Sequence, residues 1–500
     1  MEIMSEQVRT ERATEFSVDA DWDALYIDGE WRSVPDRDRI DVENPATRET
    51  FAQVPSGTVE DVDAAYDAAL AAQGEWANTS PARRSEVVRT AAQILDDHED
   101  EIKELLAVEG GSAPPKQMIE HGGSVTFTHD AASYAYRMDG KHNQSNTPGK
   151  ENIIQRKPAG TVAVISPWNV PLKLSIRAVA PAIATGNTVV LKPAGVTPIT
   201  GGLLLARLFD AAGLPDGVLN VVTGPGSTVG DRVAAHPGSD VVAFTGSTGV
   251  GRTVGENAVD HFALPALELG GNNAHVVLED ADLDQAVDAG TFGSFWNQGQ
   301  VCISINRHLV HESIYDEYAE RLAERAAELP IGDPREDDTV IGPIINESQR
   351  DEILEYVEQT VDEGATLLTG GDHDGLFVEP TVLRDATNDM SAACNEHFGP
   401  VAPIVPFSDD DEAVELANAT EYGLAGSVHS SDRGRARDVA DRIEVGMMHV
   451  NDQPVNAEPH VPFGGMKDSG MGAYNGDWII EEMTVSKWTS VQREPRDYPF

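Results

Sequence analysis

The sequence predicts an α/β protein with two domains, each built around a mainly parallel sheet. Its 500 residues exceed what one hydrophobic core usually holds, so two or three domains are expected. From residue 161 onward, short β-rich runs alternate with helical stretches, and glycines and prolines separate them. Such alternation requires crossover connections, which place successive strands parallel to one another.

The segment before this alternating region is predicted to be helical. Residues 58–108 have the pattern of two helices, the first capped by Thr58 with Asp61 three residues later. Pro81 opens the second helix, and the glycines at 110 and 111 end it. We therefore expect a pair of helices ahead of the first parallel strands.

The alternating region then gives the expected strands in order. Strands are predicted at 161–166, 188–193, 217–222 and 240–247, each followed by a helical stretch. Two short strands follow at 265–271 and 274–280. The later part has helical stretches at 282–298 and 314–328 and strand-like runs at 307–311, 379–383, 401–407 and 445–452. These later elements are enough for a second α/β domain.

The charge balance is strongly acidic. Lys and Arg number 36 against 84 Asp and Glu, which gives a net charge of −48. Such a chain repels phosphates, so nucleic-acid binding is disfavoured. The acidic residues are spread along the chain rather than gathered in blocks, and lysine is scarce. A self-repelling surface that high salt screens is typical of a salt-rich cytoplasm, so we expect a halophilic source, with an ordinary acidic enzyme as the alternative.

Targeting and redox signals are few. No apolar run approaches the roughly 20 residues of a membrane span. Residues 1–23 are charged and lack an apolar core, so we expect a loose acidic lead-in and no secretory signal. The two cysteines lie far apart and cannot form a disulfide framework, which favours a reducing cytoplasm.

The run FTGSTGVG, residues 244–251, is the first candidate binding motif. A strand that enters a glycine-rich turn and a helix offers free backbone N–H groups and a positive helix end to a phosphate. Gly246 and Gly251 are five residues apart, which is not the spacing of the G-x-G-x-x-G fingerprint. From the residues alone, a dinucleotide site and a plain strand-to-helix turn both remain open.

Two polar residues stand where they could take part in chemistry. Asn169 lies in a loop stiffened by two prolines and could donate to an oxyanion, or could merely satisfy the turn. Glu268 lies in the apolar run LELGG, where lost solvation raises a carboxyl pKa toward the range of a general base. The alternative for Glu268 is an ion pair with a nearby cation.

Cys302, in the segment FWNQGQVCISINR, is the candidate nucleophile. The polar residues before it argue against deep burial, but no histidine lies within five residues of it. A small buried hydrophobe therefore remains the alternative on the residues alone. Nothing around Cys394 suggests activation of its thiol.

Four segments in order, SPWNVPL, LELGG, NQGQVC and EHFGPV, resemble the aldehyde dehydrogenase superfamily. The resemblance runs from about residue 26 to about residue 490 and includes NPAT, PAGTVAVISPWN, GNTVVLKPA, FTGSTGVG and PFGGMKDSG. The phrases QGQVCISINRHLV and NDQPVNAEPHVPFGGMKDSG are similar to those of the benzaldehyde- and vanillin-type members.

The resemblance implies a role for each matching residue. Cys302 matches the nucleophile, Glu268 the general base and Asn169 the oxyanion donor. Lys192 matches the contact to the adenosine ribose, and Glu396 and Phe398 match the groups that hold the nicotinamide ribose and ring. The full set of cofactor-binding residues implied is Ile165, Ser166, Pro167, Trp168, Lys192, Ala194, Gly195, Gly226, Gly230, Phe244, Thr245, Gly246, Ser247, Gly251, Leu269, Gly270, Glu396 and Phe398.

The same resemblance implies an architecture and a reaction. A Rossmann-like NAD(P)-binding domain is expected at 20–125 and 147–266, and an α/β catalytic domain at 267–470. A small β element, at 126–146 and 471–495, is expected to join subunits into a homodimer or homotetramer. The expected reaction is oxidation of an aldehyde, possibly aromatic, to its acid with NAD or NADP. It passes through a cysteine thiohemiacetal and a thioester that Glu-activated water hydrolyses, without a metal.

Departures and rivals remain at this point. Many family members have an acidic residue where this chain has Gly195, so NAD and NADP both stay open. Asn272 stands at a position where lysine is common in the family, and we draw no mechanistic conclusion from this difference. The rivals are a coenzyme A-acylating semialdehyde dehydrogenase, which would not need Glu268, and a dinucleotide-binding protein without catalysis.

Overall fold

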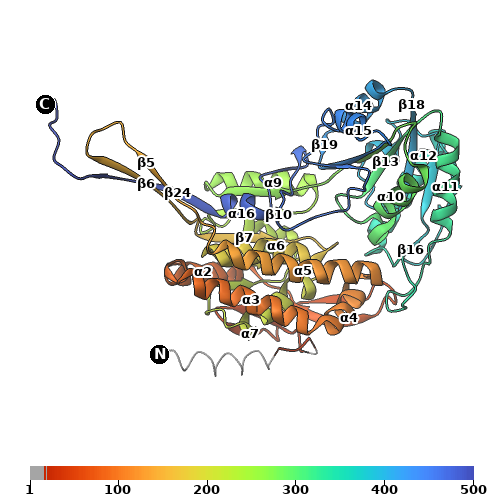
Figure 1. Ribbon diagram of the computed structural model, residues 1–500. Helices are drawn as coiled ribbons and strands as arrows, with labels where there is room; N and C mark the ends of the chain where they lie inside the picture. The colour runs from red at the N-terminus through yellow and green to blue at the C-terminus, as the bar shows by residue number, and fades with distance from the viewer. Residues whose placement is uncertain (1–15, 19) are drawn as a thin grey trace.

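The computed structural model describes residues 16–18 and 20–500 and contains two large sheets and a small third one. Most of the expected acidic lead-in, residues 1–15, lies outside the described residues, as does residue 19. Figure 1 shows the first domain, largely red to yellow-green, beside the second, green to blue, with an arm that projects away from both. The alternating α/β fold predicted from the sequence is confirmed.

The first sheet has a parallel centre and antiparallel edges. Its strand order is β2 (Glu30–Ser33), β1 (Ala24–Ile27), β9 (Leu219–Val221), β8 (Thr188–Lys192), β7 (Thr161–Ile165), β10 (Val241–Thr245), β11 (Leu264–Glu268) and β23 (Gly470–Met471). The five central strands β9, β8, β7, β10 and β11 pair in parallel, whereas β1 and β23 pair antiparallel with their neighbours. Because the parallel strands run one way, their carboxyl ends meet at one edge of the sheet, where a ligand site is expected.

Helices cover both faces of this sheet. They are α2 (Val59–Asn78), α3 (Pro81–Asp97), α4 (Glu99–Gly110), α5 (Pro114–Tyr134), α6 (Pro171–Thr185), α7 (Leu204–Ala211), α8 (Asp231–Ala234) and α9 (Thr248–Asp260), with π-helical turns η1 (Ile199–Leu203) and η2 (Gly226–Gly230). Successive residues of β7 alternate between two cores: Val162 and Val164 join the core beneath α3 and α6, and Ala163 joins the core beneath α2 and α9.

The second sheet has the order β14 (Thr366–Thr369), β17 (Thr381–Arg384), β18 (Val401–Phe407), β13 (Ile305–His311), β12 (Asn273–Val277), β20 (Ala425–His429) and β21 (Met447–Val450). Only the edge strand β14 is antiparallel to its neighbour. Its helices are α10 (Leu283–Phe295), α11 (Tyr315–Ala327), α12 (Glu347–Asp362), α13 (Ser391–Cys394), α14 (Asp410–Asn418) and α15 (Arg433–Ala440).

The third sheet forms the projecting arm. Strand β6 (Lys150–Pro158) pairs antiparallel with β5 (Lys141–Gln144) on one side and with β24 (Thr484–Gln492) on the other. The helix α16 (Gly476–Glu482) leads into β24. Three two-stranded sheets complete the fold: β3 (Arg39–Glu43) with β4 (Thr50–Pro55), β15 (His373–Asp374) with β16 (Phe377–Val378), and β19 (Tyr422–Gly423) with β22 (Met466–Lys467).

The structure corrects the predicted helix pair at 58–108, which is three helices. The second predicted helix breaks at His98, whose backbone is not helical (φ −116°, ψ 30°). Acidic residues lie on both sides of this break, at the end of α3 and in the first turn of α4. Carboxylates destabilise a helix C-terminus and stabilise an N-terminus, so this acidic run favours ending one helix and starting another.

The structure also moves the boundaries of the β element. Residues 126–134, which we assigned to it, are the last turns of helix α5. Residues 150–158, which we assigned to the first domain, form the central strand of the arm. Helix α5 escaped the periodicity analysis because its buried face includes polar residues such as Lys116, Glu120 and Ser124. No helix within the described residues is both long and apolar enough to cross a membrane.

Candidate active site

Cys302 is held by a strained segment between α10 and β13. Asn297, Gln298 and Gly299 all have positive φ angles, of 52°, 55° and 69°. A side chain at Gly299 would lie 2.0 Å from the carbonyl oxygen of Gly399, so this position requires glycine. Consecutive left-handed residues are costly, and such strain concentrates at functional sites.

Two asparagine side chains fix this segment from the neighbouring elements. The Asn169 amide donates a hydrogen bond to the carbonyl oxygen of Gln300 at 2.9 Å. The Asn273 amide donates to the carbonyl oxygens of Cys302, at 2.9 Å, and of Ser304, at 2.6 Å. Cys302 is therefore anchored through its backbone, which leaves its thiol free to face the two cavities described below.

The residues suggested as nucleophile and oxyanion donor come together. Asn169 follows strand β7, is 6% exposed, and lines the same two cavities as Cys302. One N–H of its amide is engaged with Gln300, and the amide has a second. Cys394, in contrast, is an exposed thiol at the end of α13 and lines neither of these cavities.

Glu268 ends strand β11 in a fully desolvated position. Its side chain is 1% exposed, and neither carboxyl oxygen has a hydrogen-bond partner within the described part of the chain. Burial raises its pKa to about 8, and the charge of Arg177 opposes that rise. The structure does not show the alternative, since Glu268 forms no ion pair or hydrogen bond among the described residues, although the charge of Arg177 acts on it. A carboxyl with this pKa can take up a proton near neutral pH.

The Cys302 thiol is neutral in this arrangement. Burial raises its pKa to about 12, and the nearby carboxylates of Glu396 and Glu268 add to that rise. The charge of Arg177 acts in the opposite direction. A thiolate at Cys302 therefore depends on cations at the site and on a group that accepts its proton.

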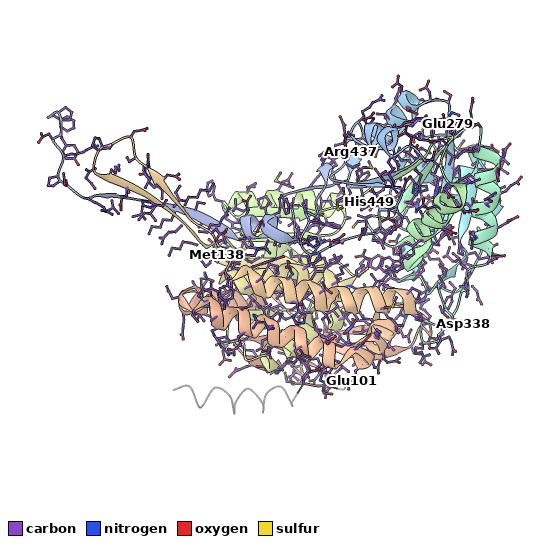
Figure 2. The ribbon with its side chains drawn as sticks, in the orientation of Figure 1. Glu101, Met138, Glu279, Asp338, Arg437 and His449 are labelled. Carbon is purple, nitrogen blue, oxygen red and sulfur yellow. The ribbon has the colours of Figure 1, made fainter. Side chains whose placement is uncertain are left out.

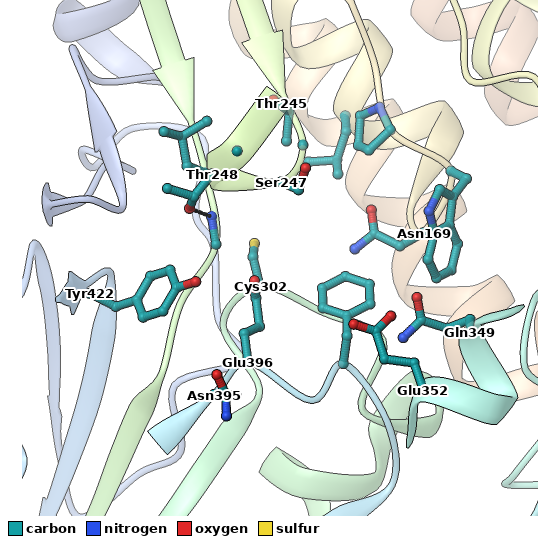
Figure 3. A pocket seen from close by; sticks show the side chains of 18 of the residues that line it. Asn169, Thr245, Ser247, Thr248, Cys302, Gln349, Glu352, Asn395, Glu396 and Tyr422 are labelled. Atoms are coloured by element: carbon teal, nitrogen blue, oxygen red, sulfur yellow. Dashed lines mark hydrogen bonds between the residues drawn. The ribbon is translucent and has the colours of Figure 1, made fainter. Parts of the chain in front are cut away.

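The first cavity, about 340 Å³, brings together half of the residues that the resemblance implies for the cofactor (Figure 3). Figure 3 shows Cys302 near its centre, between Asn169 and Tyr422. Its lining includes Pro167, Trp168, Thr245, Gly246, Ser247, Leu269, Gly270, Glu396 and Phe398. Glu396 accepts a hydrogen bond from the Gly271 N–H at 2.9 Å, and burial raises its pKa to about 7.

The other implied residues lie around this cavity rather than on its wall. Ile165, Ser166, Phe244 and Gly251 are buried behind it. Lys192 ends β8, Ala194 and Gly195 follow it, and Gly226 and Gly230 follow β9. Lys192 pairs in register with Ile165, and a side chain at Gly230 would lie 3.9 Å from the lysine stem.

This edge of the first sheet has the donors that a dinucleotide needs. Ser247 makes no side-chain cap to α9, so the first N–H groups of that helix are available. Lys192 is 6% exposed, and its amine makes no hydrogen bond or ion pair in the described residues. Burial lowers its pKa to about 8. An unpaired buried cation and an open helix N-terminus at the same edge of the sheet suit an anionic ligand.

The second cavity, about 320 Å³, lies on another side of Cys302 and is mostly apolar. Its aromatic side chains come from α10 and the turn after it, Phe292 and Trp296, and from Phe463. It also contains two cations of helix α6, Lys173 and Arg177. The analysis of the sequence gave none of these five residues a role.

Several first-cavity residues were also missed. Gln349, Glu352 and Tyr356 come from α12, a helix that the sequence analysis did not expect, and Tyr422 comes from β19. Glu352 and Tyr356 lie one helical turn apart, which places both side chains on the same face of a helix. That spacing is the signal that could have indicated a shared site. No cluster of three potential metal ligands is present in the part of the chain that the structure describes.

This chain is similar to known proteins in both sequence and fold. The profile of the Aldehyde dehydrogenase family matches residues 31–489. A benzaldehyde dehydrogenase of Bacillus subtilis is 45% identical over 95% of this chain and 98% of its own length. A vanillin dehydrogenase of Corynebacterium glutamicum is 46% identical over 93% of this chain and 97% of its own length. The crystal structure of betaine aldehyde dehydrogenase from Staphylococcus aureus in complex with NAD+ has a TM-score of 0.93 at 33% identity and covers 99% of both chains.

Proposed function

The chain belongs to the aldehyde dehydrogenase family, and from that premise we propose that it oxidises an aromatic aldehyde to the carboxylic acid with NAD or NADP. One observation carries the proposal: Cys302 lies where a polar cavity with an open helix N-terminus meets an apolar cavity with aromatic walls. The first cavity suits a dinucleotide and the second suits an aromatic ring.

The proposed reaction begins at Cys302. Its sulfur bonds to the aldehyde carbon as the thiol proton passes to solvent water, and the carbonyl oxygen becomes an oxyanion. The Asn169 amide has one N–H committed to Gln300, so its second N–H is the candidate donor to that oxyanion. The product of this step is a thiohemiacetal at Cys302.

The cofactor, when bound, supplies the acceptor for the hydride that the thiohemiacetal carbon loses. Cys302 then holds a thioester. Glu268 takes a proton from a water molecule, the water oxygen bonds to the thioester carbon, and the carbon–sulfur bond breaks. The carboxylic acid leaves and the cysteine sulfur is restored. The raised pKa of Glu268 suits this role, because its carboxylate is a stronger base than an exposed one.

Lys192, the α9 N-terminus and Glu396 are the proposed holders of the cofactor. We extend the proposal to accept NADP as well as NAD. A side chain at Gly195 would meet no heavy atom within 4 Å, so there is open space and no carboxylate at this position. A missing carboxylate removes the repulsion of a 2′-phosphate, which favours NADP by about 1–4 kcal/mol. It also removes a hydrogen bond to the 2′-hydroxyl, which weakens the binding of NAD by about 1.5–3 kcal/mol.

The rival functions make different predictions. A coenzyme A-acylating enzyme would not need the buried base Glu268, and its product formation would depend on coenzyme A. A binding protein without catalysis would not reduce its cofactor at all.

A substrate panel at high KCl tests the proposal. Purified enzyme with NAD or NADP should reduce the cofactor with benzaldehyde and release benzoate without coenzyme A. An absence of reduced cofactor with every aldehyde would refute the enzymatic proposal, and strict dependence on coenzyme A would support the acylating rival.

The arm is the proposed surface of a homodimer or homotetramer. Its strand β24 exposes Val485, Trp488 and Val491, by 44%, 64% and 40%. Exposed apolar side chains on an unpaired strand edge favour association with another chain. Light scattering should give the mass of two or four chains, and Trp488→Glu should lower it.

We also propose a halophilic source and a cytoplasmic location. The two free cysteines suit a reducing compartment, which supports the cytoplasmic location. Carboxylates such as Glu101, Glu279 and Asp338 are exposed (Figure 2), which supports the halophilic source. Arginines are outnumbered, and Arg435 contacts the carboxylates of Glu279, Asp280 and Asp410. Molar KCl screens the repulsion among the remaining carboxylates, so the unfolding temperature should rise strongly from dilute buffer to molar KCl. Equal stability in both would contradict the halophilic source.

A further inference from the structure

The second cavity has a charge opposite to that of the whole molecule. The chain carries −48 charges, with 84 acidic residues against 36 basic ones. Among the described residues that line this cavity, two are cations and none is acidic. A mostly apolar pocket therefore contains an uncompensated positive charge inside an acidic protein.

Arg177 is buried without hydrogen-bond partners. It is 3% exposed, and neither its Nε nor one of its terminal nitrogens has a partner in the described part of the chain. Its guanidinium carbon lies 4.4 Å from the ring centre of Phe463 and 4.7 Å from that of Tyr474. These rings orient the guanidinium but accept none of its hydrogen bonds, so the group retains donors for a ligand.

Lys173 lies one turn before Arg177 on α6 and faces the same cavity. Its ammonium lies 5.0 Å from the ring centre of Phe127. A side chain at Gly123 would come within 3.0 Å of its Cε, so the glycine leaves room for the lysine. Burial, with the charge of Arg177 adding to it, lowers the pKa of Lys173 to about 8.

Glu120, the buried carboxylate whose charge acts on Lys173, is already engaged. Glu120 forms an ion pair with Lys116 at 2.9 Å and accepts the N–H of Leu172, also at 2.9 Å. It therefore anchors the start of α6 rather than pairing with Lys173. Within the described residues, buried Arg177 and half-buried Lys173 form no ion pair, and an anionic ligand in the cavity would relieve the cost of burying them unpaired.

We propose that the second cavity selects aromatic aldehydes whose ring carries an anionic oxygen, a carboxylate or a phenolate, and that Lys173 and Arg177 are the residues that select them. The inference rests on the proposed function, because it names the substrate class of the same site. The aldehyde carbon goes to Cys302, the ring lies among the aromatic side chains, and the anion replaces the missing counter-ion.

The two cations have a second possible effect, which the test must separate. Arg177 also acts on the charges of Cys302 and Glu268, so its removal would slow every substrate. The ratio of kcat/KM for 4-formylbenzoate to that for 4-methoxybenzaldehyde cancels this shared effect. Recognition of the anion is the part that remains in the ratio.

The first experiment measures that ratio in wild type, Arg177→Met, Lys173→Met and Arg177→Lys. Wild type should prefer 4-formylbenzoate, and Arg177→Met should lower the ratio at least about tenfold. Lys173→Met should lower it as well, and Arg177→Lys should keep most of it. Arg437→Met, at an exposed arginine, is the matched control and should leave it unchanged. An unchanged ratio in both methionine variants would overturn the inference.

A phenol distinguishes the two kinds of anion. The wild-type enzyme is compared on 4-hydroxybenzaldehyde and 4-methoxybenzaldehyde over a range of pH. A preference for the phenol that appears only above the pKa of its hydroxyl would assign phenolates to the site. Preference for 4-formylbenzoate alone would restrict the class to carboxylates, and preference for neither would overturn the inference.

A binding experiment keeps this inference separate from the proposed function. Calorimetry with Cys302→Ala, without cofactor, should show tighter binding of 4-formylbenzoate than of 4-methoxybenzaldehyde, and Arg177→Met in that background should remove the difference. If the anionic aldehyde binds more tightly but wild type oxidises no aldehyde, the proposed enzymatic function is contradicted and anion selection by the second cavity is supported. If wild type oxidises aldehydes but shows no tighter binding of the anionic one, the enzymatic function is supported and anion selection is contradicted.

Discussion

The two cavities that meet at Cys302 differ in almost every other respect. They share Cys302, Asn169 and Leu174. The first is lined by two carboxylates, Glu352 and Glu396, and by the start of helix α9. The second is lined by aromatic and aliphatic side chains and by two cations.

The difference teaches how one thiol can serve two unlike ligands. A dinucleotide needs polar groups that bind its phosphates and hydroxyls, whereas an aromatic ring needs a pocket from which water is excluded. The first sheet provides the polar side through the ends of its parallel strands. Helix α6 and the segments around Phe292 and Phe463 provide the other. The residues shared by both cavities include those proposed to carry the chemistry.

The largest expected effect removes the shared thiol. Cys302→Ala should abolish turnover, because no other group in either cavity can form the thioester, while ligand binding on both sides persists. Steady-state assays and cofactor titration check this. Cys394→Ala should leave the rate nearly unchanged, and normal turnover in Cys302→Ala would remove the nucleophile assignment.

Loss of the buried base should separate the two half-reactions. Glu268→Gln should still give a rapid burst of reduced cofactor, because the first half-reaction does not strictly need the base. The steady-state rate should fall roughly 10²–10⁴-fold. Stopped-flow kinetics measures both phases. A steady-state rate near that of wild type would mean that another group activates the water.

The pH dependence should follow the same residue. The base works only when deprotonated, and the pKa of Glu268 is raised to about 8. The wild-type rate of thioester hydrolysis should therefore rise with pH between 6 and 9, by about a hundredfold, with its midpoint near 8. Glu268→Gln should flatten this profile. A wild-type midpoint near 4.5 would show that the carboxyl is not desolvated in the working enzyme.

A smaller effect should be confined to the cofactor side. Gly195→Glu should shift the preference toward NAD by at least about tenfold, or about 1.4 kcal/mol. The introduced carboxylate would repel a 2′-phosphate and accept from a 2′-hydroxyl. The ratio of kcat/KM for the two cofactors checks this, and selectivity among aldehydes should not change. An unchanged cofactor ratio would mean that position 195 does not contact the ribose.

Some features could be read from local sequence. Strands such as β7 and β8 are short apolar runs bounded by glycine or proline, so their pattern was sufficient. The site motifs around Asn169, Glu268 and Cys302 were recognised because each is a contiguous segment. Helix α5 was not, since its buried face contains charged and hydroxyl side chains, whereas a helix is recognised in the sequence by an apolar face.

The sequence by itself determined the α/β alternation, the acidic surface and the segments proposed to carry the chemistry, because each depends on residues near one another in the chain. Only the tertiary structure decided how those segments meet. It buried Glu268 without a hydrogen-bond partner among the described residues, which raises the pKa of its carboxyl, and it placed Asn169 against the backbone before Cys302. It also turned Lys173 and Arg177, which look like ordinary helix cations in the sequence, into an unpaired positive charge inside an apolar pocket. Solvation and long-range contacts set these properties, and neither is visible until distant segments are packed together.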